Sequence, residues 1–255
     1  MSATPAWHHE AMNIVPLRNV HFAWQGHIPF AAWIVAVMKP RVLVELGTFS
    51  GTSYAAFCQS VRDERLGTKC FAVDTWQGDA HSLCYGNEVH DDLAAFNREH
   101  FADFSTLLRL NFDEALAKFA DKSVDLMHID GFHTYDAVKH DFETWAPKLS
   151  DNAVVLFHDT AERKADFGVW KFWAQVRKGR KIAEFTHSHG LGVLFMGNTL
   201  PPQAEALVAA MGDRSPTGPQ AAFEARAKVI GRPVPDEGKR RDPLSRLIRS
   251  ISKRL

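Results

Sequence analysis

Short hydrophobic runs alternate along this chain with longer segments in which apolar residues recur every three or four positions. The first pattern is typical of buried strands and the second of helices that bury one face. Strands are expected at residues 41–47, 69–75, 106–112, 123–130 and 152–159, with two more within 181–197. Helices are expected at residues 27–39, 48–61, 113–120, 135–149 and 167–179.

Strands that alternate with helices predict a parallel sheet covered by helices on both faces. The last two strands, within residues 181–197, are joined by a short glycine-containing turn, which predicts an antiparallel edge. The expected fold class is therefore α/β, with a Rossmann-like, doubly wound and mostly parallel sheet. In such sheets, ligands bind beyond the C-terminal ends of the strands.

The chain divides into three parts by composition. Residues 1–40 are expected to form an N-terminal helical segment, and residues 41–199 the sheet domain. Inside that domain, the polar segment 76–105 is interpreted as an insertion that forms a lid or an acceptor surface. Residues 200–255 combine Ala-rich stretches with Pro and Gly, and they are interpreted as an appendage.

Composition and charge restrict the classes of function. Lys and Arg number 30, as do Asp and Glu, so the body of the chain shows no bias toward nucleic acid. The three cysteines fit neither a disulfide framework nor a zinc pattern, which favours a cytoplasmic protein. We recognise no signal peptide, and no apolar stretch is long enough to cross a bilayer.

Residues 239–255 differ from the rest, with seven Lys or Arg against one acid. One face of a helix there would carry Leu244, Leu247, Ile248, Ile251 and Leu255. This pattern predicts a basic amphipathic helix, suited to the inner face of a membrane or to the groove of a partner protein. The alternative is a helix packed on its own domain, or a frayed end.

A glycine-containing turn follows the first predicted strand, in the stretch VELGTFSGTS at residues 44–53. Gly47 and Gly51 let the backbone approach a ligand, and the helix that follows offers free N–H groups. Glu45 precedes the turn, and Asp74 ends the next strand, where a carboxylate can accept both hydroxyls of a ribose. The set predicts an adenosine-containing cofactor, although a tight turn without a ligand is the simpler alternative.

Two features of this turn argue against other nucleotides. No lysine follows Gly51, which argues against a nucleoside-triphosphate loop. The glycine spacing also departs from Gly-x-Gly-x-x-Gly, so dinucleotide binding is a minority interpretation.

Acids and histidines gather where the fourth and fifth predicted strands end. Asp130 and Asp159 can converge there on a hard divalent cation. His133 and His158 are expected to lie close enough to these acids to bind a metal or to act as a base. Each of the four could instead cap a helix or bond to backbone. Trp76, just after Asp74, is a candidate for stacking on adenine or, equally, a packing residue.

With these residues in view, the chain resembles the class I S-adenosylmethionine-dependent methyltransferases. More narrowly, it is similar to the methyltransferase domain 24 group, bacterial enzymes associated with glycosyltransferases and polysaccharide biosynthesis. The stretches that carry the resemblance lie within residues 27–197 and include VELGTFSGTSYAAFCQ, VDTWQGD, DLMHIDGFHTYDAVKHDFETWAPKLS, VVLFHDT and HGLGVLF. The resemblance implies seven strands with a reversed last strand.

The resemblance also implies roles for individual residues. Around the methionine part of the cofactor it places Glu45, Gly47, Thr48, Ser50, Gly51 and Ser53. Asp74 would bind the ribose, Trp76 and Asn111 would lie near adenine, and Asp130 would lie near the sulfonium. For a divalent metal such as Mg²⁺, or a transition metal, the implied ligands are Asp130, His158 and Asp159, with His158 where some relatives have another acid.

The expected activity is O-methylation of a sugar hydroxyl on a glycan or a glycosylated metabolite, with S-adenosyl-L-methionine as cofactor. An acceptor hydroxyl would attack the methyl group in line, and His133 or a metal would lower its proton affinity. Two alternatives remain: a dinucleotide-dependent oxidoreductase, and a non-catalytic scaffold that contacts a glycosyltransferase or a membrane through the basic C-terminal end.

Overall fold

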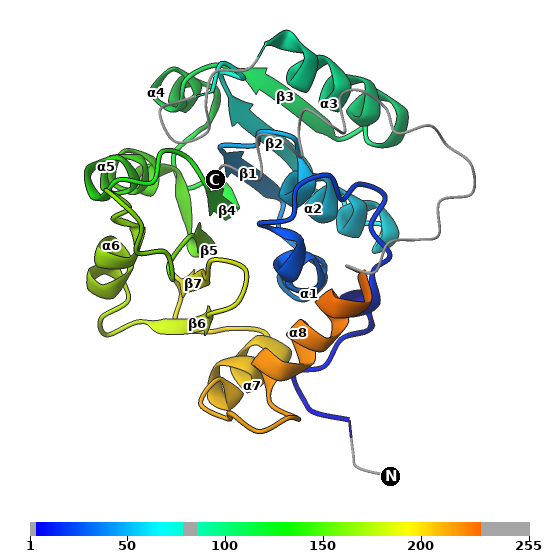
Figure 1. Cartoon of the computed structure of the whole chain (residues 1–255), viewed down its shortest axis with the longest axis vertical. Helices are drawn as coiled ribbons and strands as arrows, with labels where there is room; N and C mark the ends of the chain where they lie inside the picture. Colours follow the sequence, from blue (N-terminus) through cyan, green and yellow to red (C-terminus); the bar gives the residue numbers. More distant parts are fainter. Residues whose placement is uncertain (1–3, 79–85, 231–255) are drawn as a thin grey trace.

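The computed structural model describes residues 4–78 and 86–230. At its centre is a seven-stranded sheet with helices on both sides (Figure 1). The strands are β1 (Val42–Leu46), β2 (Lys69–Asp74), β3 (Ser105–Arg109), β4 (Val124–Ile129), β5 (Leu149–His158), β6 (Lys181–Phe185) and β7 (Leu191–Phe195). All seven predicted strands are present, and their ends differ from the prediction by a few residues.

The strand order is β3-β2-β1-β4-β5-β7-β6. The first five strands pair in parallel, and β7 is antiparallel to both of its neighbours. The prediction of a doubly wound, mostly parallel sheet with a reversed last strand is therefore confirmed. Because Leu46 pairs with Ile129, and Ile129 with Phe157, the residues that follow β1, β4 and β5 meet at one edge of the sheet.

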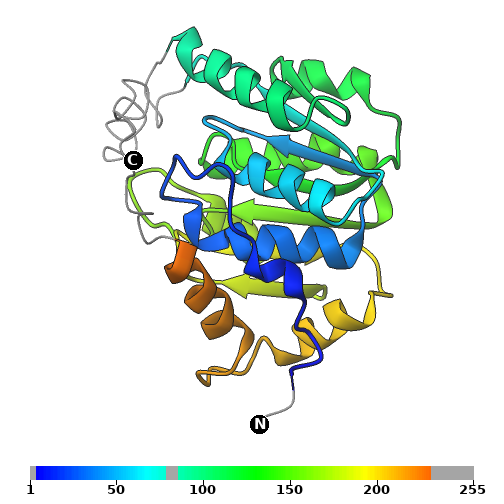
Figure 2. The ribbon, with the colours of Figure 1, turned by 90° about the vertical axis from the view of Figure 1, so that its right-hand side faces the viewer.

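Helices cover the sheet in two groups, each with its own hydrophobic cluster. One face is covered by α1 (Ile28–Met38), α2 (Thr52–Asp63), α3 (Asn87–His100), α7 (Pro202–Ala210) and α8 (Pro219–Ile230). Figure 2 looks onto this face and shows α3, α2, α1 and α8 stacked along it. The other face is covered by α4 (Phe112–Ala115), α5 (Tyr135–Trp145) and α6 (Val169–Val176).

The N-terminal part is less helical than expected. Before α1, residues 4–27 form only the short 3-10 helices η1 (Glu10–Asn13) and η2 (Gln25–His27). Two further 3-10 turns, η3 (Leu116–Lys118) and η4 (Ala146–Lys148), extend α4 and α5. Helix α1 itself is apolar on all sides, and it is buried because η1, α2 and α8 pack around it.

Residues 200–230 are part of the core, so the prediction of an appendage was wrong for this stretch. Phe223 of α8 is fully buried, with its ring 5.5 Å from Phe30, 6.2 Å from Trp33 and 5.4 Å from Phe185 between centroids. Pro202 and Pro219 begin α7 and α8, and Gly212 lies just after α7, yet the apolar faces of both helices are part of the core. Residues 231–255, with the predicted amphipathic helix, lie outside the described residues.

The predicted insertion at residues 76–105 is described only in part, because residues 79–85 lie outside the described residues. Helix α3 accounts for much of the rest and packs Val89 and Leu93 into the core. Its role as a lid or acceptor surface stays a prediction. Among the described residues, no helix combines the length and apolar character needed to cross a membrane.

Candidate functional site

A cavity of about 310 Å³ opens at the edge of the sheet where β1 to β5 end. Its wall comes from the turn after β1, the loops after β2 to β5, and residues 21–24 near the N-terminus. The predicted site residues in the wall are Gly47, Thr48, Ser50, Ser53, Asp74, Asn111, Asp130, His133, His158 and Asp159. Three predicted residues, Glu45, Gly51 and Trp76, are not part of it.

The glycine turn (residues 47–51) is shaped for a polar ligand. Gly47 has φ +84°, and a Cβ atom there would lie 2.1 Å from the carbonyl oxygen of Asp130, so only glycine lets β1 and β4 end this close together. The hydroxyls of Thr48 and Ser50 are buried without a hydrogen-bond partner among the described residues. Unpaired buried hydroxyls are costly, and a polar ligand in the cavity would pair them.

Asp74 lies in the cavity wall and also holds the glycine turn in place. One carboxylate oxygen accepts from the backbone N–H groups of Thr48 at 2.9 Å and Phe49 at 2.8 Å, and the other accepts from Trp76 at 2.7 Å. A carboxylate offers about four lone-pair sites, and these N–H groups occupy three of them. The contact with a ribose stays a prediction.

The two residues expected near adenine have different positions. Asn111 lies in the cavity wall, and its side chain also caps α4 by accepting from the N–H of Glu114 at 2.8 Å. Trp76 is fully buried, and its indole N–H donates to the carbonyl of Phe49 at 2.9 Å. The structure thus places Trp76 as a packing residue under the glycine turn, which was the alternative interpretation, and not as a stacking partner in the cavity.

Glu45 is buried behind the cavity and bonds to a histidine. Its Oε2 lies 2.8 Å from Nδ1 of His128, whose Nε2 accepts from the indole N–H of Trp24 at 3.2 Å. Because an indole can only donate, Nδ1 of His128 carries the ring proton and donates it to Glu45. Burial raises the pKa of Glu45, although His128 opposes the shift. Glu45 therefore lies outside the direct reach expected for the methionine part of a cofactor.

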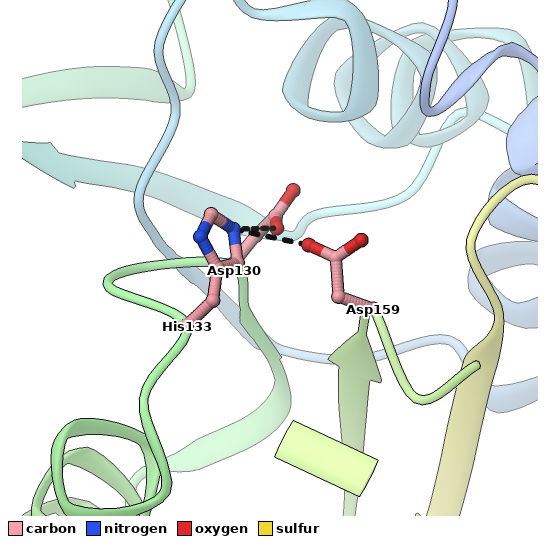
Figure 3. A group of neighbouring side chains, drawn as sticks. All are labelled: Asp130, His133 and Asp159. Carbon is pink, nitrogen blue, oxygen red and sulfur yellow. Dashed lines mark ion pairs between the residues drawn. The ribbon is translucent and has the colours of Figure 1, made fainter. Parts of the chain in front are cut away.

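Four side chains form an acid–histidine cluster (Asp130, His133, His158 and Asp159) at the other end of the cavity. Nε2 of His133 lies 3.0 Å from Oδ2 of Asp159 and 3.8 Å from Oδ1 of Asp130. Figure 3 shows the imidazole of His133 facing both carboxylates, which come from the ends of β4 and β5. The His133 ring also stacks on Phe167 at 4.6 Å between centroids. The structure thus assembles the four residues that the sequence singled out.

The carboxylates and the histidines of this cluster shift the pKa values of one another toward the charged forms. Burial alone would lower the pKa of His133, but hydrogen bonds to Asp130 and Asp159 raise it to about 10. In the same way, the two carboxylates outweigh burial and raise the pKa of His158. Burial would raise the pKa values of Asp130 and Asp159, but the two histidines lower both. The cluster is therefore two carboxylates balanced by two imidazolium ions.

His158 is not placed to bind a metal, which corrects one of the predicted ligands. Its Nδ1 faces Asp130 at 3.1 Å and its Nε2 faces the carbonyl of Ser188 at 3.1 Å, so both nitrogens donate to acceptors. Among the described residues, the group with ligand atoms close enough for one ion is Asp130, His133 and Asp159, within 4.8 Å of one another. A neutral His133 would complete that set.

Comparison with known proteins finds similarity over this part of the chain. Residues 44–160 match the Methyltransf_24 family, which is described as a methyltransferase domain. The chain is also 50% identical over 191 residues to the uncharacterised protein y4gI of Sinorhizobium fredii. That match covers 73% of the chain but only 21% of y4gI, so the chain spans about a fifth of this curated relative.

Solved structures share the fold of this chain at low sequence identity. A Corynebacterium glutamicum protein has a TM-score of 0.54 at 13% identity, over 70% of this chain and 83% of its own. The methyltransferase PaMTH1 of Podospora anserina was solved with S-adenosylhomocysteine (SAH). It has a TM-score of 0.50 at 16% identity, over 66% of this chain and 76% of its own. The O-methyltransferase TomG of Streptomyces achromogenes was solved with S-adenosylmethionine. It has a TM-score of 0.50 at 13% identity, over 75% of this chain and 91% of its own.

The sequence analysis missed one wall of the cavity. The N-terminal segment (residues 15–24) lies over α2 and brings His21, Phe22 and Trp24 into the wall. Buried Arg18 holds it there, because its guanidinium donates to the carbonyl of Ser50 at 2.7 Å and pairs with Asp92. The run HFAW at residues 21–24 was the available signal, but nothing in the sequence places it next to β4.

Proposed function

We propose that this chain is an S-adenosylmethionine-dependent O-methyltransferase. The observation that carries the proposal is one continuous cavity, with the unpaired hydroxyls of Thr48 and Ser50 at one end and the acid–histidine cluster at the other. The family match supports it, as do the folds of PaMTH1 and TomG, which were solved with S-adenosylhomocysteine and S-adenosylmethionine. A binding scaffold would not need charged groups gathered at the strand ends.

The residues of the chain would bind the cofactor along the cavity. Gly47, Thr48, Ser50 and Ser53 would contact its methionine part, the last three through their hydroxyls. Asp74 would accept the ribose hydroxyls, and Asn111 would lie near adenine. Glu45 would act from behind this wall, by orienting His128 and Trp24. When bound, S-adenosylmethionine supplies a methyl group on a positively charged sulfur.

The protein would contribute chiefly by placing and desolvating the reacting groups. Asp130 belongs to the acid–histidine cluster, and its backbone lies next to Gly47 of the glycine turn, where its charge would attract the sulfonium. His133 and His158 would keep Asp130 ionised and oriented in this buried place. As the hydroxyl acceptor we propose a sugar on a glycan or a glycosylated metabolite, within polysaccharide biosynthesis at the inner face of the membrane.

The test of this proposal is calorimetric titration of the purified chain with SAH and S-adenosylmethionine, with NADH as the control ligand. We expect micromolar binding of both sulfur compounds, no binding of NADH, and at least tenfold weaker binding in Asp74→Ala. Transfer of a tritiated methyl group to methyl glycosides, nucleotide sugars and catechol would follow. Absence of binding by folded protein would refute the proposal, and binding of NADH alone would favour an oxidoreductase.

A divalent cation is a second part of the proposal, and it would be held by Asp130, His133 and Asp159. Two carboxylates and one imidazole suit Mn²⁺ or another transition metal better than Mg²⁺. The ion would stabilise negative charge on an acceptor oxygen. Titration of metal-stripped protein with MnCl₂ tests this part of the proposal. Binding that is lost in Asp159→Asn would support it, whereas no heat of binding in either protein would refute it.

A further inference from the structure

We infer that His21 is the catalytic residue that takes the proton from the acceptor hydroxyl, an inference that rests on the proposed methyl transfer. His21 lies in the wall of the cavity, on the N-terminal segment. Its Nε2 atom is buried and has no hydrogen-bond partner among the described residues. An unpaired ring nitrogen next to a cavity is the arrangement that a proton acceptor needs before its substrate arrives.

The other histidines of the cavity wall are engaged by neighbours. Nε2 of His133 is held by Asp159 at 3.0 Å, and both nitrogens of His158 have acceptors. Nδ1 of His189 lies 2.6 Å from Oε1 of Glu162. Nε2 of His21, unlike Nε2 of His133 and both nitrogens of His158, has no hydrogen-bond partner to displace among the described residues. A hydroxyl in the cavity could therefore donate to it directly.

Contacts of its backbone and of its ring fix the position of His21. Its backbone N–H donates to Oγ1 of Thr52 in the first turn of α2 at 3.0 Å. Its ring stacks on Phe22 at 5.5 Å between centroids, and meets the edge of Phe49 in the glycine turn at 5.4 Å and 90°. Phe22 and Phe49 both contact the ring, which limits the rotation of the imidazole.

The surroundings also suit a proton acceptor. Burial lowers the pKa of His21 to about 4, so the ring is neutral at physiological pH. Several charged groups face it: Asp130 from β4, His158 and Asp159 from β5, and His189 from the turn between β6 and β7. The two acids raise the proton affinity and the two histidines lower it. The carboxylates would therefore stabilise the imidazolium that forms during the reaction.

The step balances without a further reactant. The acceptor O–H bond breaks as the new O–CH₃ bond forms, and the proton moves to Nε2 of His21. The bond between the methyl carbon and sulfur breaks, and its electron pair stays on sulfur to give S-adenosylhomocysteine. His21 then releases its proton to water when the product leaves, which restores the neutral ring.

The first test needs no known acceptor, because it uses SAH as the probe. A crystal structure of the complex should place the sulfur end, and not the adenine, toward His21. Nitrogen-15 NMR of the complex should show a neutral His21 ring at pH 6. Adenine stacked on His21, or a protonated ring at pH 6, would overturn the inference while leaving the methyltransferase proposal intact. Failure of SAH to bind would instead refute the proposed function.

Kinetics on a hydroxyl acceptor from the methyl-transfer screen provide the second test. His21→Gln should lower kcat by about 10²- to 10⁴-fold, leave the KM for S-adenosylmethionine within about twofold, and remove the acid limb of the pH–kcat profile. His100→Gln, a matched change at the end of α3 and outside the cavity wall, should change neither value. A normal kcat in His21→Gln, or an unchanged acid limb, would overturn the inference.

Discussion

The two ends of the cavity are built in different ways. The glycine turn is held by backbone: Asp74 accepts from the N–H groups of Thr48, Phe49 and Trp76. The acid–histidine cluster is held by side-chain charge, through pairs that join the ends of β4 and β5. The glycine turn offers shape and buried hydroxyls without partners among the described residues, whereas the acid–histidine cluster offers buried charge.

Loss of a charge from the acid–histidine cluster is expected to have the largest effect on stability. Asp159→Ala removes one of the two anions that balance His133 and His158, and leaves a buried positive charge without a partner. We expect the free energy of unfolding to fall by about 3–5 kcal/mol in urea denaturation at pH 7. The control is Asp121→Ala, which breaks an ion pair with Lys148 whose acid is exposed, and which should cost about 0–1 kcal/mol. Equal losses in the two variants would contradict a charge-balanced cluster.

Asp141 can be compared with the acid–histidine cluster, because it is a buried carboxylate without the charge balance of that cluster. Burial raises its pKa to about 7, with His140 opposing the shift and Asp113 adding to it. The folded state therefore keeps a proton that the unfolded state releases near pH 4, so stability falls as the pH rises from about 4 to 7. Above pH 7 this loss is complete.

Asp141→Asn should remove this pH-dependent loss of stability. We expect its free energy of unfolding to exceed that of the unmodified chain by up to about 4 kcal/mol at pH 8, and the two to converge near pH 4. Urea denaturation at several pH values measures the difference. Glu143→Gln, an exposed acid on the same helix, should show almost no pH-dependent difference. A constant gain for Asp141→Asn at all pH values would exclude titration as its cause.

The smallest expected effect concerns the contact that joins the N-terminal segment to the glycine turn. Arg18→Met removes the bond to the Ser50 carbonyl and the pair with Asp92, but keeps much of the side-chain volume over Phe96. We expect a loss of about 1–2 kcal/mol by urea denaturation, because Asp92 is partly exposed and becomes solvated. The control is Arg62→Met on the exposed side of α2. A loss no larger than that of the control would mean that Arg18 does not anchor the segment.

Much of the architecture could be predicted because it depends on local patterns. Runs such as residues 42–46 and 124–129 have a strand pattern, and the glycine turn between β1 and α2 has a spacing that is visible in sequence. The C-terminal part was misjudged because Pro and Gly are conspicuous, whereas the burial of Phe223 depends on partners far away along the chain, such as Phe30 and Phe185.

The sequence by itself determined the alternation of strands and helices, the edge of the sheet at which a cavity was expected, and the residue types gathered there. Only the tertiary structure decided the pairing: His158 with Ser188 and Asp130, Glu45 with His128, and His21 with no partner for its Nε2 among the described residues. The physical reason is that secondary structure follows from the periodicity of neighbouring residues. Whether a buried histidine is a cation, a structural bridge or a base depends instead on which acceptors and donors the fold brings within hydrogen-bond distance.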